Sequence, residues 1–221
     1  MSEHGERIPI LTPTGRVSAA VRVPDGADAM VVVAHGAGTG MDHPFMVGYC
    51  DALNELGFAT LRFNFAYVED GKKLPDRPPK AIAVWAAVVD EARRRAPGLP
   101  LWAAGKSFGG RMASMAVAEG EMDAAGLVFL GYPLHPAGNP AKLRDEHLYG
   151  LTLPMLFLQG TRDTLATAEL LEGVVAKLPN ATLAWQEDAD HSFAIKGVKR
   201  TPFAIGASLA APTAEFVRAA R

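Results

Sequence analysis

The chain has 221 residues, of which 49% are hydrophobic and 21% are charged, and this length and composition suit one globular domain over residues 1–221. Its formal net charge of −2 supplies no broad basic surface, which argues against a nucleic-acid partner. The lack of any run of about eighteen apolar residues argues against a membrane span, and residues 1–7 lack the hydrophobic stretch of a secretion signal, so we expect a cytoplasmic protein.

Strands and helices are predicted to alternate along the chain. Residues 17–23 alternate weakly between apolar and polar positions and predict an early edge strand. Residues 30–34 form a continuous apolar run, which is typical of a parallel strand covered on both faces. Further strands are expected at 58–63, 101–104, 127–130, 155–158 and 182–185, and helices at about 44–56, 80–95, 111–119 and 165–178. This order predicts the α/β class, with a mainly parallel sheet and helices on both faces.

The most informative motif is Gly105-Lys106-Ser107-Phe108-Gly109, which lies between a predicted strand and a predicted helix. A G-x-S-x-G sequence in this position is typical of a nucleophile elbow, a tight turn that raises a serine hydroxyl out of the backbone. The two glycines have no Cβ and therefore relieve crowding at the turn. The helix that follows directs its positive dipole end at the serine. Ser107 is the candidate nucleophile.

A serine nucleophile needs a base to take its proton and an acid to orient that base. In folds with this elbow the three residues follow in the order serine, acid, histidine, each on a loop after a strand. Asp163 follows the strand at 155–158, and His191 follows the strand at 182–185, so these two are the candidate acid and base. The alternative for Asp163 is a helix cap ahead of Leu165.

Other residues compete for the two roles. Asp188 and Asp190 are rival acids, but neighbours of a histidine along one loop rarely reach its ring well. The loop at 131–133, another position for the acid in such folds, has no carboxylate, which favours Asp163. His35 is interpreted as a residue that fixes a loop. Of the remaining histidines, one lies near the N-terminus, one begins a helix and two are expected at the surface: His4, His43, His135 and His147.

The segment His35-Gly36-Ala37-Gly38-Thr39-Gly40 follows the strand at 30–34 and is the candidate oxyanion loop. Two backbone N–H groups must face a developing oxyanion, one after the nucleophile and one from this loop. Here these are the amides of Phe108 and Ala37. A dinucleotide-binding turn is excluded, because the third glycine of that fingerprint would fall at Met41 and no acid ends the next strand.

These motifs together resemble the α/β-hydrolase family over roughly residues 31–193. The segments that carry the resemblance are 35–46, 105–111, 131–136 and 190–193. They are similar to one branch in particular, which includes testis-expressed hydrolase-like proteins and a regulatory subunit of a histone-acetylating complex. The resemblance implies an α/β-hydrolase sheet with Ser107, Asp163 and His191 as a catalytic triad. Dienelactone hydrolases are similar in size but usually carry a cysteine nucleophile, from which Ser107 departs.

The sequence leaves no room for a large cap domain. Residues 132–153, which precede the strand at 155–158, can hold one short helix at about 140–147. The other candidate cover is the segment 67–79, which follows a strand and is expected at the mouth of the crevice where ligands bind in open α/β sheets. We expect a shallow, open site. The residues expected to line it are His35, Gly36, Gly38, Lys106 and Tyr132.

Lys106 is an unusual neighbour for a nucleophile, and the sequence leaves two explanations for it. Its side chain either points to solvent or to a nearby carboxylate, or its charge stabilises an anionic intermediate or attracts an acidic substrate. The sequence does not decide between them.

The sequence favours a metal-independent serine hydrolase that needs no cofactor and acts on a small-molecule acyl ester or thioester. No H-E-x-x-H motif or spaced Cys/His set predicts a metal site. The competing class is a protein-interaction module that keeps the fold while its chemistry is idle. Retention of every catalytic part favours the enzyme. The oligomeric state is left open between a monomer and a homodimer, and the only cysteine, Cys50, cannot form an internal disulfide.

Overall fold

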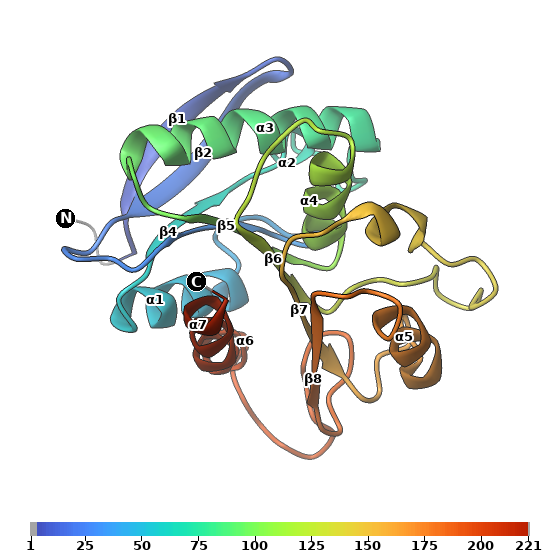
Figure 1. The fold of residues 1–221 in the computed structure, drawn as a ribbon. Helices are drawn as coiled ribbons and strands as arrows, with labels where there is room; N and C mark the ends of the chain where they lie inside the picture. The colour runs from blue at the N-terminus through green and yellow to red at the C-terminus, as the bar shows by residue number, and fades with distance from the viewer. Residues whose placement is uncertain (1–3, 221) are drawn as a thin grey trace.

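A sheet of eight strands runs through the structure, a computed structural model that describes residues 4–220 (Figure 1). The strands are β1 (Glu6–Thr12), β2 (Gly15–Arg22), β3 (Met30–Ala34), β4 (Ala59–Phe63), β5 (Leu101–Lys106), β6 (Gly126–Leu130), β7 (Met155–Gly160) and β8 (Ala181–Gln186). Their order in the sheet is β1-β2-β4-β3-β5-β6-β7-β8. All pairs from β4 to β8 are parallel, whereas β2 is antiparallel to both β1 and β4. The predicted mainly parallel sheet is therefore confirmed.

Helices cover both faces of this sheet, as the sequence predicts (Figure 1). One face carries α1 (Pro44–Glu55), α6 (Pro202–Ser208) and α7 (Ala210–Ala219). The other face carries α3 (Pro78–Arg95), α4 (Phe108–Ala118) and α5 (Ala168–Val175), together with the short 3₁₀ helix η1 (Glu146–Gly150). Side chains of β3 alternate between the two cores, because successive strand residues point to opposite faces. This double burial explains the unbroken apolar run in its sequence.

The prediction of an edge strand at residues 17–23 is wrong, because β2 lies between β1 and β4. The edge on this side of the sheet is β1, which the sequence analysis missed. Ile8, Ile10 and Thr12 are buried and alternate with exposed neighbours, but Pro9 interrupts the pattern. A proline is tolerated there because an edge strand has one side that pairs with no other strand.

The helix predictions differ from the structure mainly at the C-terminus. Helices α6 and α7 lie in a segment for which the sequence analysis makes no prediction. The helix expected at 165–178 spans only α5, and the short helix expected at 140–147 is replaced by η1. A further short helix, α2 (Ala66–Glu69), begins the segment considered as a cover.

The order of the strands creates a crevice at the carboxyl ends of β3 and β5. These strands are neighbours, yet the chain leaves β3 through α1 on one face and leaves β5 through α4 on the other. The two connections therefore turn away from each other, and ligands of open α/β sheets bind at such a switch point. The glycine-rich loop after β3 and Ser107 after β5 both lie there.

Among the helices of residues 4–220, none combines the length and hydropathy needed to cross a bilayer. Residues 1–3 belong to the N-terminal segment from which we predicted the absence of a secretion signal, and they lie outside the described residues.

Helices α1 and α6 cross in direct backbone contact. A Cβ added to Gly206 would lie 2.0 Å from the carbonyl oxygen of Phe45, and one added to Gly48 would lie 2.2 Å from that of Phe203. Any side chain at either position would therefore push the helices apart. The crossing fixes α6 against the core of the protein.

We predict that Gly206→Ala lowers the free energy of unfolding by at least about 2 kcal/mol, because a methyl group has no room between the two backbones. The matched control is Gly173→Ala in α5, where an added Cβ meets nothing within 4 Å. That substitution should instead raise stability by about 0.5–1 kcal/mol. Urea unfolding of both variants measures the two changes in the free energy of unfolding. Equal changes at the two positions would contradict the close backbone contact between α1 and α6.

Candidate active site

Ser107 occupies the turn between β5 and α4 with φ 49° and ψ −112°, a strained conformation for a residue that is not glycine. The flanking glycines make this turn possible. A Cβ on Gly105 would lie 2.2 Å from the nitrogen of Gly110, and a Cβ on Gly109 would lie 2.6 Å from the carbonyl oxygen of His35. The backbone therefore has the tight geometry that the G-x-S-x-G sequence predicts.

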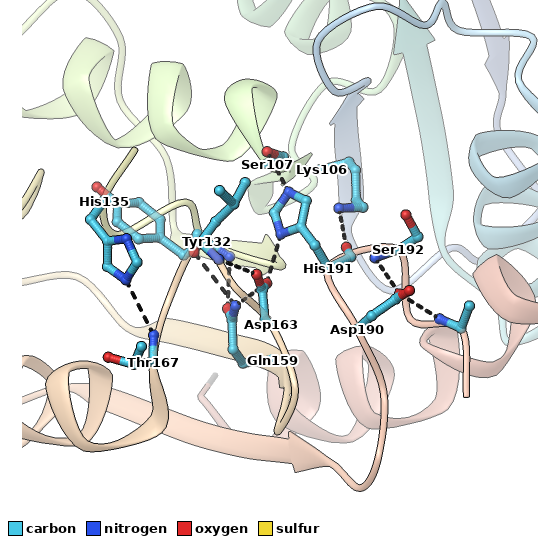
Figure 2. Close-up of polar contacts among 12 residues, drawn as sticks. Lys106, Ser107, Tyr132, His135, Gln159, Asp163, Thr167, Asp190, His191 and Ser192 are labelled. Carbon is cyan, nitrogen blue, oxygen red and sulfur yellow. Dashed lines mark hydrogen bonds and ion pairs between the residues drawn. The ribbon is translucent and has the colours of Figure 1, made fainter. Parts of the chain in front are cut away.

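A continuous hydrogen-bonded chain joins the three residues that the sequence analysis selected (Figure 2). The Ser107 hydroxyl lies 2.8 Å from His191 Nε2, and His191 Nδ1 lies 2.6 Å from Asp163 Oδ2. With Nδ1 protonated toward the carboxylate, Nε2 is left as the acceptor for the serine hydroxyl. The Asp163 side chain is fully buried, whereas the His191 ring keeps about a quarter of its surface exposed. The structure thus brings together residues 56 and 28 positions apart in the sequence.

Asp163 is also held by groups other than the histidine. Its Oδ1 accepts a hydrogen bond from the Leu165 amide at 2.8 Å within a turn, and the helix-cap alternative is wrong, because α5 begins at Ala168 after its N-cap Thr167. Its Oδ2 accepts a second bond, at 2.5 Å, from the buried side-chain amide of Gln159. The Gln159 carbonyl oxygen in turn accepts from the Tyr132 amide at 2.8 Å. Sequence reasoning missed Gln159, whose only signal is a polar residue near the end of an apolar strand.

The two rival acids, Asp188 and Asp190, have other contacts in the loop that carries His191. Asp190 Oδ1 accepts hydrogen bonds from the amides of Ser192 and Ala194, at 2.8 and 3.0 Å, and so closes the turn that follows His191 (Figure 2). Asp188 has a positive φ of 56°, and its amide donates to Thr161 Oγ1 at 2.8 Å. Both residues shape the loop that carries the histidine.

The loops that carry Asp163 and His191 are joined through their backbones. The amide of Arg162 donates to the carbonyl of Ala189 at 2.9 Å, and the amide of Thr161 donates to that of Gln186 at 3.1 Å. Gly160 permits this approach, because a Cβ there would lie 2.2 Å from the Ala189 oxygen. Asp163 and His191 are therefore fixed relative to each other by backbone bonds as well as by their own side-chain contact.

His35 fixes the loop after β3 through hydrogen bonds of its buried ring, and it does not line the pocket. Its Nδ1 donates to the carbonyl of Gly36 at 2.8 Å, and its Nε2 accepts from the amide of Phe65 at 3.2 Å. The ring is fully buried, and this burial lowers its pKa to about 4. Tyr67 adds a further bond from its hydroxyl to the Gly36 carbonyl, at 3.3 Å.

The candidate oxyanion donors lie where the sequence analysis expects them. Ala37 belongs to the loop after β3, and Phe108 is the first residue of α4, directly after Ser107. Among residues 4–220, no acceptor is found for the amide of either residue. Gly38, with φ 74°, turns the loop back but does not line the pocket.

A pocket of about 590 Å³ opens beside Ser107 and His191. Its walls come from Gly36, Ala37 and Thr39 after β3, from the start of α1, from Lys106 and Leu165, and from the C-terminal segment that includes Ala194, Arg200, Pro202 and Ile205. No residue of the segment 67–79, the candidate cover, lines it. That segment supports the glycine-rich loop through Tyr67, and the C-terminal segment forms the outer wall instead.

Tyr132 lies away from the pocket lining, contrary to its expected place. Its ring packs edge-on against Phe129 and Phe157 in the core under α4, and its hydroxyl donates to the carbonyl of Arg144 at 2.6 Å. Its backbone amide is linked to the site, because it donates to Gln159, whose side-chain amide in turn donates to Asp163.

The remaining histidines differ from the expectations in part. His135 is buried, and its Nε2 accepts from the Thr167 amide at 3.4 Å, so the predicted surface role is wrong (Figure 2). His147 bonds Ser114 at 2.8 Å, and burial lowers its pKa to about 4. His43 caps α1 through the Phe45 amide and lines the pocket. His4 contacts Asp51 at 2.7 Å.

The first explanation for Lys106, a side chain directed to solvent or to a carboxylate, does not describe its bond, and the effect of its charge on an intermediate or a substrate stays a prediction. Its ammonium group donates to the backbone carbonyl of His191 at 2.7 Å (Figure 2). Burial lowers its pKa to about 8, and the charges of Asp163 and Asp190 oppose this shift. The side chain therefore turns inward, between the elbow and the histidine loop.

Residues 4–220 contain no group of three or more His, Cys, Asp or Glu side chains placed to hold a metal ion. The geometry places a serine hydroxyl, bonded to an imidazole, beside two amides that have no acceptor among residues 4–220.

Comparison with known proteins shows the same architecture. Residues 27–217 match the family described as alpha/beta hydrolase domain. Among solved structures, a serine hydrolase without a lid from Xanthomonas campestris is 23% identical, with a TM-score of 0.75 over 99% of this chain and 96% of that one. A dienelactone hydrolase from Anabaena variabilis is 19% identical, with a TM-score of 0.77 over 98% of both chains. An esterase from Pyrococcus furiosus is 17% identical, with a TM-score of 0.76 over 97% and 90%. At these identities the structures show the α/β-hydrolase fold, as predicted, and the resemblance to the testis-expressed branch stays a prediction.

Acid should destabilise the loop at His35. The folded pKa of about 4 lies below the unfolded value of 6.5, so the folded state resists protonation and stability falls as the pH decreases from 6.5 toward 4. Between pH 7 and pH 5 this residue alone should lower the free energy of unfolding by about 2 kcal/mol. His35→Asn should remove that part of the pH dependence and leave the part due to His147. Urea unfolding at the two pH values measures it, and an unchanged pH dependence in the variant would refute the assignment.

Proposed function

The chain belongs to the alpha/beta hydrolase family, and from this premise we propose that it is a serine hydrolase that cleaves carboxylic esters or thioesters. The observation that carries the proposal is the hydrogen-bonded chain from Ser107 through His191 to Asp163, beside a pocket and two unpaired amides. A serine hydroxyl aligned in this way with a histidine and a buried carboxylate is the arrangement that activates the hydroxyl at neutral pH.

In the proposed reaction, Ser107 Oγ attacks the carbonyl carbon of the substrate while His191 Nε2 takes the hydroxyl proton. The carbonyl oxygen becomes an oxyanion and accepts hydrogen bonds from the amides of Ala37 and Phe108. His191 then gives its proton to the leaving alcohol or thiol as the carbon–oxygen or carbon–sulfur bond breaks. A water molecule repeats the sequence on the acyl-enzyme, which releases the acid and restores Ser107.

Asp163 supports this cycle without taking the proton. Its carboxylate fixes the Nδ1–H tautomer of His191 and stabilises the imidazolium that forms during each half-reaction. The bonds from Gln159 and Leu165 give the carboxylate two donors besides His191, which helps to satisfy a buried charge. The acid therefore needs no solvent contact.

The pocket favours an acyl ester with a small to medium apolar part. Its volume of about 590 Å³ lies within the common range for small-ligand sites. Its apolar lining includes Phe45, Met46, Leu165 and Ile205. The shallow, open site expected from the sequence stays a prediction, and one wall of the pocket is built from the C-terminal segment.

We predict that a fluorophosphonate probe labels the wild-type protein, which should also hydrolyse p-nitrophenyl esters or acyl-CoA thioesters of graded chain length. Ser107→Ala should abolish labelling and lower kcat by at least about a thousandfold. The control is Ser18→Ala on β2, far from the pocket, which should behave like the wild type. Absence of labelling in the wild type would favour the competing class, a protein-interaction module with the same fold.

Two isosteric substitutions separate the acid from its rival. Asp163→Asn should lower kcat by about a thousandfold or more, because an amide no longer fixes the required histidine tautomer. Asp190→Asn should lower it less than tenfold, since an amide oxygen can still accept from Ser192 and Ala194. Steady-state kinetics on one ester measures both variants. Equal losses at the two positions would remove Asp163 from its proposed role.

A further inference from the structure

The side chain of Lys106 leaves the sheet on the face that carries α1, α6 and α7. Side chains alternate along a strand, and Trp102 and Ala104, which precede Lys106 by even numbers of residues on β5, belong to the core on that face. Phe193, two residues after His191, belongs to the same core. The lysine next to the nucleophile and the loop that carries the histidine therefore meet on one side of the sheet.

Lys106 contacts three parts of the site at once. Its ammonium nitrogen lies 2.7 Å from the His191 carbonyl oxygen and 5.5 Å from the centre of the Phe193 ring. Its aliphatic stem runs beside the oxyanion loop, since a Cβ added to Gly36 would lie 3.4 Å from Lys106 Cγ. Gly131 leaves room for the ammonium, because a Cβ there would lie 3.3 Å from Lys106 Nζ and 3.5 Å from His191 Nδ1.

We propose that Lys106 is a positioning residue, which holds the His191 backbone so that its imidazole stays aligned with Ser107. The inference rests on the proposed function and deepens it. Two bonds then join the elbow to His191. The Ser107 hydroxyl bonds His191 Nε2, and the Lys106 ammonium group bonds the His191 backbone carbonyl.

The histidine loop needs such a support because its backbone is strained. Asp188 and Phe193 flank His191 and have positive φ values of 56° and 61°. Each non-glycine residue in this region costs on the order of 1–3 kcal/mol, and the surrounding contacts must overcome that cost. Asp190 closes one side of the loop through two amides. Lys106 holds the His191 carbonyl, which takes no part in these bonds.

The geometry directs the charge of Lys106 at the loop that carries His191. A hydrogen bond from an ammonium group to a carbonyl is charge-assisted and stronger than a neutral one. Asp163 and Asp190 both favour the protonated amine, and with a pKa lowered by burial to about 8 the group remains mostly charged at neutral pH. Its short contact at 2.7 Å is to the backbone of His191.

The first test is Lys106→Met, which keeps the stem beside Gly36 and removes the ammonium group. We expect kcat on a p-nitrophenyl ester to fall by about 10- to 100-fold, because misplacement of a catalytic group by about 1 Å has an effect of this size. KM should change less than threefold, and the rate of fluorophosphonate labelling should fall in parallel with kcat. The control is Lys196→Met, an exposed lysine beyond the same loop, which should retain wild-type kinetics.

The second test restores the amine chemically. Lys106→Cys treated with 2-bromoethylamine regains an ammonium group at nearly the original distance, whereas iodoacetamide adds a neutral amide of similar size. The only native cysteine, Cys50, is buried, and its pKa is raised to about 12, so it should not react. Aminoethylation should recover at least a tenth of the wild-type kcat, and carbamidomethylation should not.

A Lys106→Met variant with kcat within twofold of the wild type would overturn the inference. A loss of kcat in Lys106→Cys that aminoethylation fails to restore would also overturn it, because Lys106 would then contribute only to packing. If the wild type neither hydrolyses esters nor reacts with the probe, the proposed function fails separately. A crystal structure of Lys106→Met then decides the inference: a His191 ring displaced from Ser107 supports it, and an unmoved ring refutes it.

Discussion

The close contact between the β5–α4 turn and the end of β3 is the constraint on which the site depends. A Cβ on Gly109 would lie 2.8 Å from the carbonyl oxygen of Ala34, and one on Gly110 would lie 2.6 Å from that of Gly105. The Trp85 indole donates to the Gly109 carbonyl at 3.2 Å and closes the contact from α3. With the two backbones in contact, the Ser107 hydroxyl and the Ala37 amide are held at the same crevice. A bulkier turn would separate the nucleophile from one of its oxyanion donors.

The acid and base are held by a second contact of the same kind, between the loops after β7 and β8. Gly160 lets the Ala189 backbone pass, and the Arg162 amide bonds it. Gln159 and Leu165 then direct the Asp163 carboxylate at His191. The site therefore depends on two backbone contacts made possible by glycine, and Lys106 spans the space between them.

The strands of the central sheet and the proposed triad could be predicted because their signals are local. Strand β3 is a continuous apolar run, and the elbow is a short motif between a strand and a helix. The parts that were missed depend on long-range contacts. Gln159 is recognised only once its amide is seen to face Asp163, and the direction of Lys106 depends on a carbonyl 85 residues away. The edge strand β1 was hidden by Pro9, whose effect depends on its place at the end of the sheet.

The C-terminal segment shows most clearly what a local pattern cannot reveal. Nothing in its alanine-rich sequence predicts that Pro202 and Ile205 line the pocket, because their place follows from the crossing of α6 with α1 at Gly48 and Gly206. Phe193 adds to this assembly by stacking on Phe45, with ring centres 6.0 Å apart, so the histidine loop and the pocket wall share one core. A wall fixed by backbone contact cannot open by rearranging side chains alone. In the proposed function, the size of the acyl group is therefore set by the side chains on α1 and α6, and the same core that holds this wall also holds the loop of the general base.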